Sequence, residues 1–241
     1  MFKGSIVIPA RYESSRFPGK PLALINGKPM IQHVYEKCVV AVGRELVHVA
    51  TDNNDIKDVV EMFGGQVVMT SSECLTGTDR LAEANKYLNM DFIVNVQGDE
   101  PMISSNDIKM VYERMASQTE YILNCYCDIE DHEIRMHTVP KVVVSQSDRL
   151  IYISRGGCPF DKAGEPRALY KQICIYGFSR AHLIAFTSHH IKTNNEKVED
   201  IEILRFLDLD FSVYMIKVSA GGVAVDTPED LDRVRQLMLP L

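Results

Sequence analysis

The residues best suited to chemistry begin with a cation-rich loop, residues 9–21, which carries Arg11, Arg16 and Lys20. The loop follows an apolar run at residues 5–8 and is rich in proline, glycine and serine. It cannot continue a strand, because proline fixes φ and lacks an N–H donor. Forked arginine contacts, a lysine point charge and loop N–H groups together neutralise a polyanion such as a triphosphate. We therefore expect a phosphate-binding loop here rather than a solvated basic turn.

Asp99 belongs to a second polar segment, residues 95–101. This segment begins at the end of an apolar run at residues 92–96. A buried strand that ends in Gln-Gly-Asp places a carboxylate at the carboxyl edge of a sheet, the edge that also carries the first loop. Mg²⁺ prefers carboxylate, water and phosphate oxygens, so Asp99 is a candidate magnesium ligand. Gly98 is expected to let a ligand approach the backbone. The alternative is a simple turn that begins at an aspartate.

Asp226 precedes a third segment, residues 227–230, whose pattern is typical of a helix start. Thr227 suits the N-cap, Pro228 suits the first helical position, and the two acids that follow favour the positive end of the helix. This start does not require Asp226. We therefore expect Asp226 to be a second metal ligand, opposite Asp99.

Three further sites carry weaker signals. Residues 76–80 read Thr-Gly-Thr-Asp-Arg, and their hydroxyl groups either cap a helix or contact a nucleotide. Lys141 and Arg155 follow or end strands in the second half of the chain and are candidates to meet a carboxylate substrate. Exposed surface positions are the alternative for both.

The elements that must position these residues alternate regularly in the first half of the chain. Apolar runs predict strands, and apolar residues at helical spacing predict the helices between them. The alternation indicates a parallel sheet with right-handed crossovers. The carboxyl edge of such a sheet is where open α/β folds bind nucleotides, although neither a Walker A motif nor G-x-G-x-x-G is present. We expect strands at 6–8, 46–50, 66–69 and 92–96, and helices at 29–40, 55–63, 78–88 and 104–115.

The pattern changes after about residue 120, where strands follow one another without helices between them. This indicates a mixed or antiparallel extension that carries acceptor specificity or a dimer contact. A polar stretch at residues 161–167 is expected to be a mobile loop. We expect strands at 121–126, 140–145, 150–154, 172–178 and 211–218, and helices at 196–209 and 228–238.

The bulk composition excludes several classes of protein. The 241 residues are 46% hydrophobic and 24% charged, which is ordinary for a soluble globular chain of one domain or one domain with a subdomain. A net charge of −7 argues against general nucleic-acid binding. Six cysteines without a C-x-x-C pair indicate reduced thiols in a cytoplasmic protein. No signal-peptide pattern is present, and no apolar run is long enough to span a membrane.

Several of these segments together resemble the CMP-Kdo synthetases, which are 3-deoxy-manno-octulosonate (Kdo) cytidylyltransferases. The resemblance covers nearly the whole chain and is strongest over residues 5–103. It implies one Rossmann-like nucleotidyltransferase domain over residues 1–241, with a mostly parallel central sheet. It also implies a smaller mixed or antiparallel extension at about 120–180, used for sugar binding and dimerisation. The segments that carry the resemblance are residues 9–22, 26–31, 50–52, 76–82, 95–101 and 225–231.

The resemblance further implies an enzyme that couples CTP to an acidic keto-sugar and releases pyrophosphate. It implies a cytoplasmic homodimer that uses Mg²⁺ and makes a CMP-sugar for lipopolysaccharide or capsule, with no nucleic-acid or membrane partner. The catalytic residues would be Lys20, Asp99 and Asp226, of which the two aspartates hold the metal. Nucleotide contacts would come from Ala10, Arg11, Arg16, Lys20, Thr76, Gly77, Thr78 and Arg80. Sugar contacts would come from Gln97, Arg155, Gln172, Tyr176 and Glu202.

Positions in the second half depart from the family pattern where the family meets its acceptor sugar. Gln172 stands in place of a histidine, Ile203 stands in place of a glutamine, and Glu202 keeps the acid. A site that loses sugar-hydroxyl partners discriminates differently between substrates. Our hypothesis is that CTP use is retained and that the acceptor is Kdo or another ulosonic acid. The alternatives are a sialic-acid-like acceptor, a different base, or a non-catalytic nucleotide- or sugar-binding protein.

Overall fold

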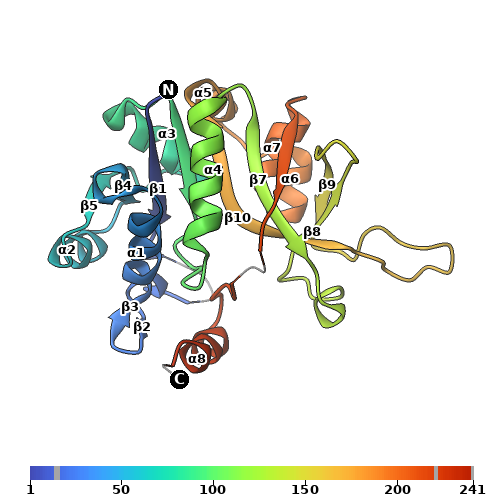
Figure 1. The fold of residues 1–241 in the computed structure, drawn as a ribbon, viewed down its shortest axis with the longest axis horizontal. Helices are drawn as coiled ribbons and strands as arrows, with labels where there is room; N and C mark the ends of the chain where they lie inside the picture. The colour runs from blue at the N-terminus through green and yellow to red at the C-terminus, as the bar shows by residue number, and fades with distance from the viewer. Residues whose placement is uncertain (14–16, 220–221, 240–241) are drawn as a thin grey trace.

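The apolar runs of the first half form the parallel part of a central sheet (Figure 1). The structure is a computed structural model that describes residues 1–13, 17–219 and 222–239. Within these residues β1 lies between β4 and β6, and β4 also pairs with β5, all in parallel. The predicted parallel sheet is therefore confirmed. Its strands are β1 (Gly4–Ala10), β4 (Val47–Thr51), β5 (Gln66–Met69) and β6 (Phe92–Val96).

Three helices connect these strands and a fourth follows β6, and together they cover both faces of the sheet. Side chains of a strand alternate between its faces, so Ile6 and Ile8 pack on one side and Val7 on the other. The first side is covered by α1, α2 and α4, and the second by α3. The helices are α1 (Met30–Val42), α2 (Asn54–Met62), α3 (Gly77–Leu88) and α4 (Ser105–Ser117).

The second half extends the same sheet with antiparallel strands, as the sequence predicted. β10 runs antiparallel to β6, β7 and β8, while β9 pairs with β8 and β11 pairs in parallel with β7. The strand order through the main sheet is β11-β7-β10-β6-β1-β4-β5. The added strands are β7 (Ile122–Asp128), β8 (Lys141–Val144), β9 (Leu150–Ser154), β10 (Tyr170–Ser179) and β11 (Val213–Lys217).

One helical prediction of the second half was wrong in detail, and one helix was not predicted. The expected helix at 196–209 is two short helices, α6 (Asn194–Glu199) and α7 (Ile203–Asp208). Asp200 separates them with a positive φ of 53°, the left-handed conformation that ends a helix. The helix α5 (Arg180–Ser188) was not predicted from the sequence; it starts directly at the end of β10. Ser179 caps α5 by accepting a hydrogen bond from the backbone N–H of His182.

The C-terminal helix α8 (Pro228–Leu237) docks on a small N-terminal hairpin, β2 (Leu24–Ile25) and β3 (Lys28–Pro29). A separate apolar cluster joins them, and the Arg235 guanidinium donates to the Leu24 carbonyl at 2.8 and 3.0 Å. This docking carries Asp226 to the loop that follows β1. The cluster consists of Ile25, Met30, Val225, Leu231 and Val234. Short 3₁₀ helices lie at η1 (Lys20–Leu22), η2 (Arg44–Leu46) and η3 (Asp131–Glu133).

The segment expected to be a mobile loop, residues 161–167, is a hydrogen-bonded turn. Asp161 Oδ1 accepts from the backbone N–H groups of Ala163 and Glu165, and Oδ2 accepts from Arg167 Nε at 2.8 Å. A bridge between Phe160 and Pro166 closes the turn. The chain between β9 and β10 projects away from the rest of the molecule (Figure 1).

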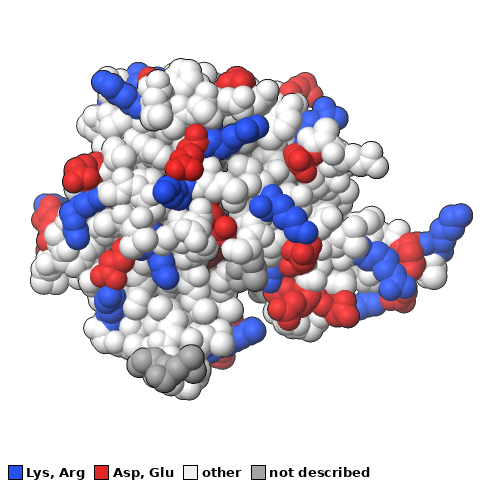
Figure 2. Space-filling model, viewed as in Figure 1, with Lys and Arg blue, Asp and Glu red and all other residues white. Residues whose placement is uncertain are grey.

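The surface carries charges of both signs. On the face shown in Figure 2, acidic and basic side chains are interspersed rather than gathered into one basic stripe. Among the described residues, no helix combines the length and apolar character needed to cross a lipid bilayer.

A buried ion pair fixes α6 against α7 and so positions the turn between them. Arg205 is fully buried and makes two hydrogen bonds of 2.7 Å with the Glu196 carboxylate. Its guanidinium also lies 3.7 Å from the ring centre of Phe186 and 3.6 Å from Asp79 of α3. The turn at residues 200–202 is therefore anchored from both sides.

We predict that Glu196→Ala lowers the free energy of unfolding by about 3–5 kcal/mol, because it leaves a buried guanidinium without its main partner. Urea denaturation measures the change. Glu113→Ala is the control, since it removes an exposed carboxylate from an i,i+4 pair with Lys109 and should cost far less. Equal losses in the two variants would contradict the assigned role of the buried pair.

Candidate active site

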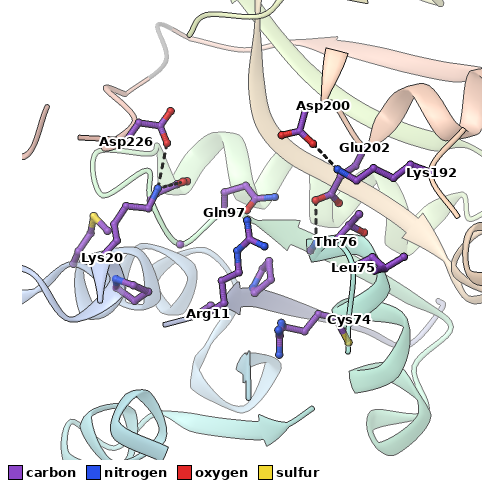
Figure 3. Close-up of a pocket in the computed structure, with 18 of the residues that line it drawn as sticks. Arg11, Lys20, Cys74, Leu75, Thr76, Gln97, Lys192, Asp200, Glu202 and Asp226 are labelled. Atoms are coloured by element: carbon purple, nitrogen blue, oxygen red, sulfur yellow. Dashed lines mark hydrogen bonds and ion pairs between the residues drawn. The ribbon is translucent and has the colours of Figure 1, made fainter. Parts of the chain in front are cut away.

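A cavity of about 580 Å³ opens at the carboxyl edge of the parallel strands (Figure 3). This volume is in the range of small-molecule sites. Three walls come from the loops after β1, before α3 and after β6. The fourth comes from the second half and the C-terminal segment. The lining includes Ala10, Arg11, Lys20, Thr76, Gly77, Arg80, Gln97, Asp99, Arg155, Lys192, Asp200, Glu202 and Asp226.

Two carboxylates converge on one ammonium group in this cavity. Lys20 Nζ lies 2.7 Å from Asp99 Oδ2 and 3.3 Å from Asp226 Oδ1. Figure 3 labels Lys20 and Asp226 and marks the contact between them. The backbone N–H of Val225 donates to the Asp99 carbonyl at 2.9 Å, so the two aspartate segments are joined directly. The structure thus brings together the three residues that the sequence singled out from distant segments.

The local start of α8 explains why Asp226 faces the cavity. Thr227 Oγ1 accepts from the Asp230 N–H at 3.2 Å, as the predicted N-cap should. The Asp230 carboxylate accepts in return from the N–H groups of Thr227 and Asp226. The cap therefore fixes the backbone of Asp226 while its carboxylate contacts Lys20.

Gly98 lines the cavity, where the expected approach of a ligand stays a prediction, and it also lets two loops of the protein pack closely. A Cβ atom at this position would lie 3.3 Å from both the Pro9 carbonyl oxygen and Ile31 Cδ1. The protein's own backbone at the end of β1 therefore makes one close approach to Gly98. The absence of a side chain lets the loop that carries Asp99 pack against the loop that carries the cations.

The two aspartates offer the donor chemistry that a hard divalent cation prefers, and the Lys20 ammonium shows that they stabilise a positive charge between them. Within the described residues, no group of three or more His, Cys, Asp or Glu side chains is arranged to hold a metal. A divalent ion here would therefore take its remaining ligands from substrate oxygens or water, as Mg²⁺ usually does.

The neighbouring Glu100 carries less than a full negative charge at this edge. Burial, followed by the nearby charge of Asp99, raises the pKa of its carboxyl to about 7. One of its oxygens accepts from the backbone N–H of Cys174 at 3.4 Å. Glu100 is therefore only partly ionised at neutral pH.

The residues expected to contact the nucleotide differ in where the structure places them. Ala10, Arg11 and Gly77 line the cavity, whereas Arg16 lies outside the described residues. The Thr76 hydroxyl caps α3, accepting from the Asp79 N–H at 3.1 Å. Thr76 therefore caps the helix and also lines the cavity, and its contact with a nucleotide stays a prediction.

Arg80 lines the cavity but is itself held by the protein. Its guanidinium donates to Thr70 at 2.6 Å and to Asp52 at 3.0 Å, and the residue is 3% exposed. It therefore forms a fixed wall, with its charge already paired.

Glu202 caps α3 from a distant part of the chain. Its carboxylate accepts from the N–H groups of Gly77 and Thr78 at 2.9 and 2.8 Å, and from Thr78 Oγ1 at 2.6 Å. A negative charge at a helix N-terminus is favourable. The resemblance implied a sugar contact for Glu202 and a nucleotide contact for Thr78, and here the two residues contact each other.

Three charged residues of the second half complete the cavity wall. Arg155 donates to the carbonyls of Glu199 and Asp200 at 2.6 and 3.2 Å, which fixes its position. The Lys192 ammonium lies 2.5 Å from Asp200 and holds the pKa of that carboxyl below its ordinary value, with Arg155 and Arg11 adding to the effect. Lys192 and Asp200 were missed from sequence, because Lys192 lies in a polar stretch and Asp200 lies inside the helix expected at residues 196–209.

Gln172 and Tyr176, which the resemblance implied as sugar contacts, are not among the residues that line the cavity. Gln172 Nε2 donates to Asn124 Oδ1 at 2.9 Å, and both side chains are buried. The Tyr176 ring is also buried and stacks on Phe178. The strand direction of β10, with its bulge between Ile173 and Tyr176, turns these two side chains into the interior.

Lys141 is also committed to the protein interior, so the expected contact with a carboxylate substrate is wrong. Its fully buried ammonium donates to the carbonyls of Met136, Val139 and Arg155 at 2.6–2.8 Å. Burial lowers the pKa of this ammonium. Three carbonyl acceptors satisfy all three of its donors, which makes it a support for the segment that carries Arg155.

Comparison with known proteins gives a consistent result. The family model described as cytidylyltransferase matches residues 5–214. The 8-amino-3,8-dideoxy-manno-octulosonate cytidylyltransferase of Shewanella baltica is 38% identical over 238 residues, covering 96% of this chain and 97% of its own length.

Solved structures agree with the sequence comparison. A CMP:2-keto-3-deoxy-manno-octonic acid synthetase complexed with CTP matches with a TM-score of 0.90 at 38% identity, covering 98% of both chains. A putative glucose-1-phosphate thymidylyltransferase from Bacillus anthracis matches with a TM-score of 0.68 at 20% identity, covering 99% of this chain and 97% of its own. This second likeness concerns the fold alone.

We predict that Glu202→Ala speeds hydrogen exchange at the amides of Gly77 and Thr78 by about tenfold or more, because a charged acceptor is lost. Exchange measured by mass spectrometry on short peptides tests this. Glu202→Gln keeps one acceptor oxygen and should show a smaller change. Unaltered exchange at these amides in the alanine variant would show that the cap contributes nothing.

Proposed function

This chain belongs to the cytidylyltransferase family, and on that premise we propose that it transfers CMP from CTP to a 3-deoxy-manno-octulosonate-type sugar acid, releasing pyrophosphate. The observation that carries the proposal is the convergence of Lys20, Asp99 and Asp226 in a cavity at the carboxyl edge of the sheet. The chain is a nucleotidyltransferase by family. The proposal adds the two substrates and the residues that act on them.

The proposed acceptor class follows from the similar proteins. One relative is named for the 8-amino sugar, and the similar solved structure is named for the sugar without that amine. The two names share an eight-carbon acidic keto-sugar and differ at its last carbon. We therefore propose an octulosonate with either a hydroxyl or an amino group at that carbon. Arg155 and Lys192 at the cavity wall suit its carboxylate.

The proposed nucleotide site is the first-half wall of the cavity. Arg11 and Lys20 supply positive charge for the triphosphate, and the loop before α3 supplies backbone groups for the nucleoside. Arg16 is proposed for the same role from its place in the sequence. The segments meet at the sheet edge where open α/β folds bind nucleotides.

We propose Asp99 and Asp226 as the residues that hold Mg²⁺. Bound there, the ion would neutralise phosphate charge and lower the pKa of the attacking hydroxyl. The chain's own part is to hold the triphosphate so that the anomeric hydroxyl of the sugar reaches the α-phosphorus and pyrophosphate leaves in line. Positioning and electrostatics then supply most of the rate, and no covalent enzyme intermediate is needed.

We predict that the purified protein releases pyrophosphate from CTP with Kdo or its 8-amino analogue, and that mass spectrometry finds the CMP-sugar. Asp99→Asn should abolish turnover and leave the fold intact by circular dichroism, because it removes a ligand charge and no packing. An active Asp99→Asn enzyme would contradict the metal assignment.

The same pyrophosphate-release assay with a panel of acidic keto-sugars as acceptors also separates the alternative functions. If only a sialic acid is accepted, the protein is a cytidylyltransferase for that sugar and the octulosonate acceptor is wrong. CTP binding without pyrophosphate release for any acid would indicate a binding protein instead.

We further propose a cytoplasmic homodimer whose product serves lipopolysaccharide or capsule. All six cysteines are free thiols, which suits a reducing compartment. The strands and turn that project from the sheet expose apolar side chains that suit contact with a second copy. These side chains are Ile151, Phe160 and Leu169, which are 57%, 61% and 64% exposed.

We predict that light scattering finds a dimer and that Phe160→Asp makes it a monomer, because a charge is placed at the proposed contact. Tyr87→Asp is the control, since Tyr87 is a 70% exposed aromatic on α3. A monomeric parent protein, or a Phe160→Asp protein that stays dimeric, would contradict this interface.

A further inference from the structure

Lys20 contacts the two carboxylates that are proposed to hold a metal. Both contacts are short, with Nζ within 3.3 Å of one oxygen from each aspartate. The Lys20 side chain is 14% exposed, and those of Asp99 and Asp226 are 29% and 26% exposed. Water screens these charges less than it screens charges on an open surface, so their attraction is correspondingly stronger.

The backbone of Lys20 is fixed, so only its side chain can leave the carboxylates. Gly19 has the left-handed φ of 70°, and Lys20 begins the short helix η1 directly after it. The Lys20 N–H donates to Phe17, and its carbonyl accepts from the Ala23 N–H at 3.1 Å. The four-carbon stem of lysine carries rotatable donors that can reach a different anion from the same backbone position.

A divalent cation and the Lys20 ammonium compete for the same oxygens. Mg²⁺ coordinates carboxylate oxygens at about 2.1 Å, which an ammonium in hydrogen-bond contact with both carboxylates would oppose by charge repulsion. A triphosphate in the cavity offers Lys20 an alternative anion beside Arg11. Removing the ammonium from the aspartates then exposes the two negative charges to the metal.

We propose that Lys20 is an internal counter-ion that excludes divalent metal from Asp99 and Asp226 until a triphosphate draws its ammonium away. This inference rests on the metal site of the proposed function. It makes metal and nucleotide binding mutually dependent: the protein alone binds metal weakly, and the nucleotide strengthens that binding. Because coupling between sites is reciprocal, the metal strengthens nucleotide binding by the same factor. The arrangement also offsets one of the two negative charges and weakens their mutual repulsion while the cavity is empty of substrate.

The test is binding of Mn²⁺ alone, followed by the electron paramagnetic resonance signal of the free ion. Lys20→Met should bind Mn²⁺ about tenfold or more tightly than the parent protein without nucleotide, a typical size for coupling between sites. Lys20→Arg keeps the positive charge and should stay weak. Lys28→Met is the matched control, because it removes a lysine that pairs with Glu36 at 2.6 Å and does not line the cavity.

Two further measurements complete the test. Adding CTP should tighten Mn²⁺ binding far more in the parent protein than in Lys20→Met, because only the parent has an ammonium to displace. The gain of Lys20→Met should vanish in the double variant that adds Asp99→Asn, which places the new affinity at the proposed carboxylates. If the methionine variant fails to fold by circular dichroism, Lys20→Gln takes its place.

The outcomes distinguish this inference from the proposed function. If Lys20→Met binds Mn²⁺ as weakly as the parent, while CTP still brings Mn²⁺ to the parent but not to Asp99→Asn, the metal site stands and the counter-ion role is overturned. If Mn²⁺ binds to no variant even with CTP, the metal site fails and the inference fails with it. If Lys20→Met binds Mn²⁺ more tightly than the parent protein without nucleotide, and the added Asp99→Asn change removes this gain, the counter-ion role is supported.

Discussion

The central constraint in this molecule is that two like charges must share one cavity. Asp99 and Asp226 both face the edge of the sheet, and their mutual repulsion must be offset by a cation. In the structure that cation is Lys20, at 2.7 and 3.3 Å. Three segments far apart in sequence therefore have to meet at one point. The backbone contact between Val225 and Asp99, and the docking of α8 on the N-terminal hairpin, bring them there.

The same cavity joins the two halves of the chain. The parallel half supplies the loops after β1 and β6, and the second half supplies the turn between α6 and α7. Glu202 connects the two halves, because it belongs to that turn and caps helix α3 of the parallel half. The buried pair of Arg205 and Glu196 holds the turn in place behind it. These acidic and basic residues near the cavity therefore bind other groups of the protein, and in doing so they hold the cavity wall in position.

Much of the fold could be predicted because its signals are local. The alternation of apolar runs and helical spacing identified the strands and helices of the parallel half, and β5, β6 and β9 have the predicted bounds. The break at Asp200 could not be predicted, since it depends on a left-handed residue with no glycine to mark it. The helix α5 was missed because its start continues directly from a strand whose apolar pattern hides the change of period.

The sequence by itself determined the type of fold and the chemistry available at the sheet edge. Residue type and position after a strand are enough for that, because parallel strands end at one edge. Tertiary structure alone decided which polar side chains face the cavity. Gln172 and Lys141 found partners in the interior, whereas Lys192 and Asp200 line the cavity wall. The physical reason is that a buried polar group must be satisfied by whichever partner lies within reach, and only the packed chain determines which partner that is.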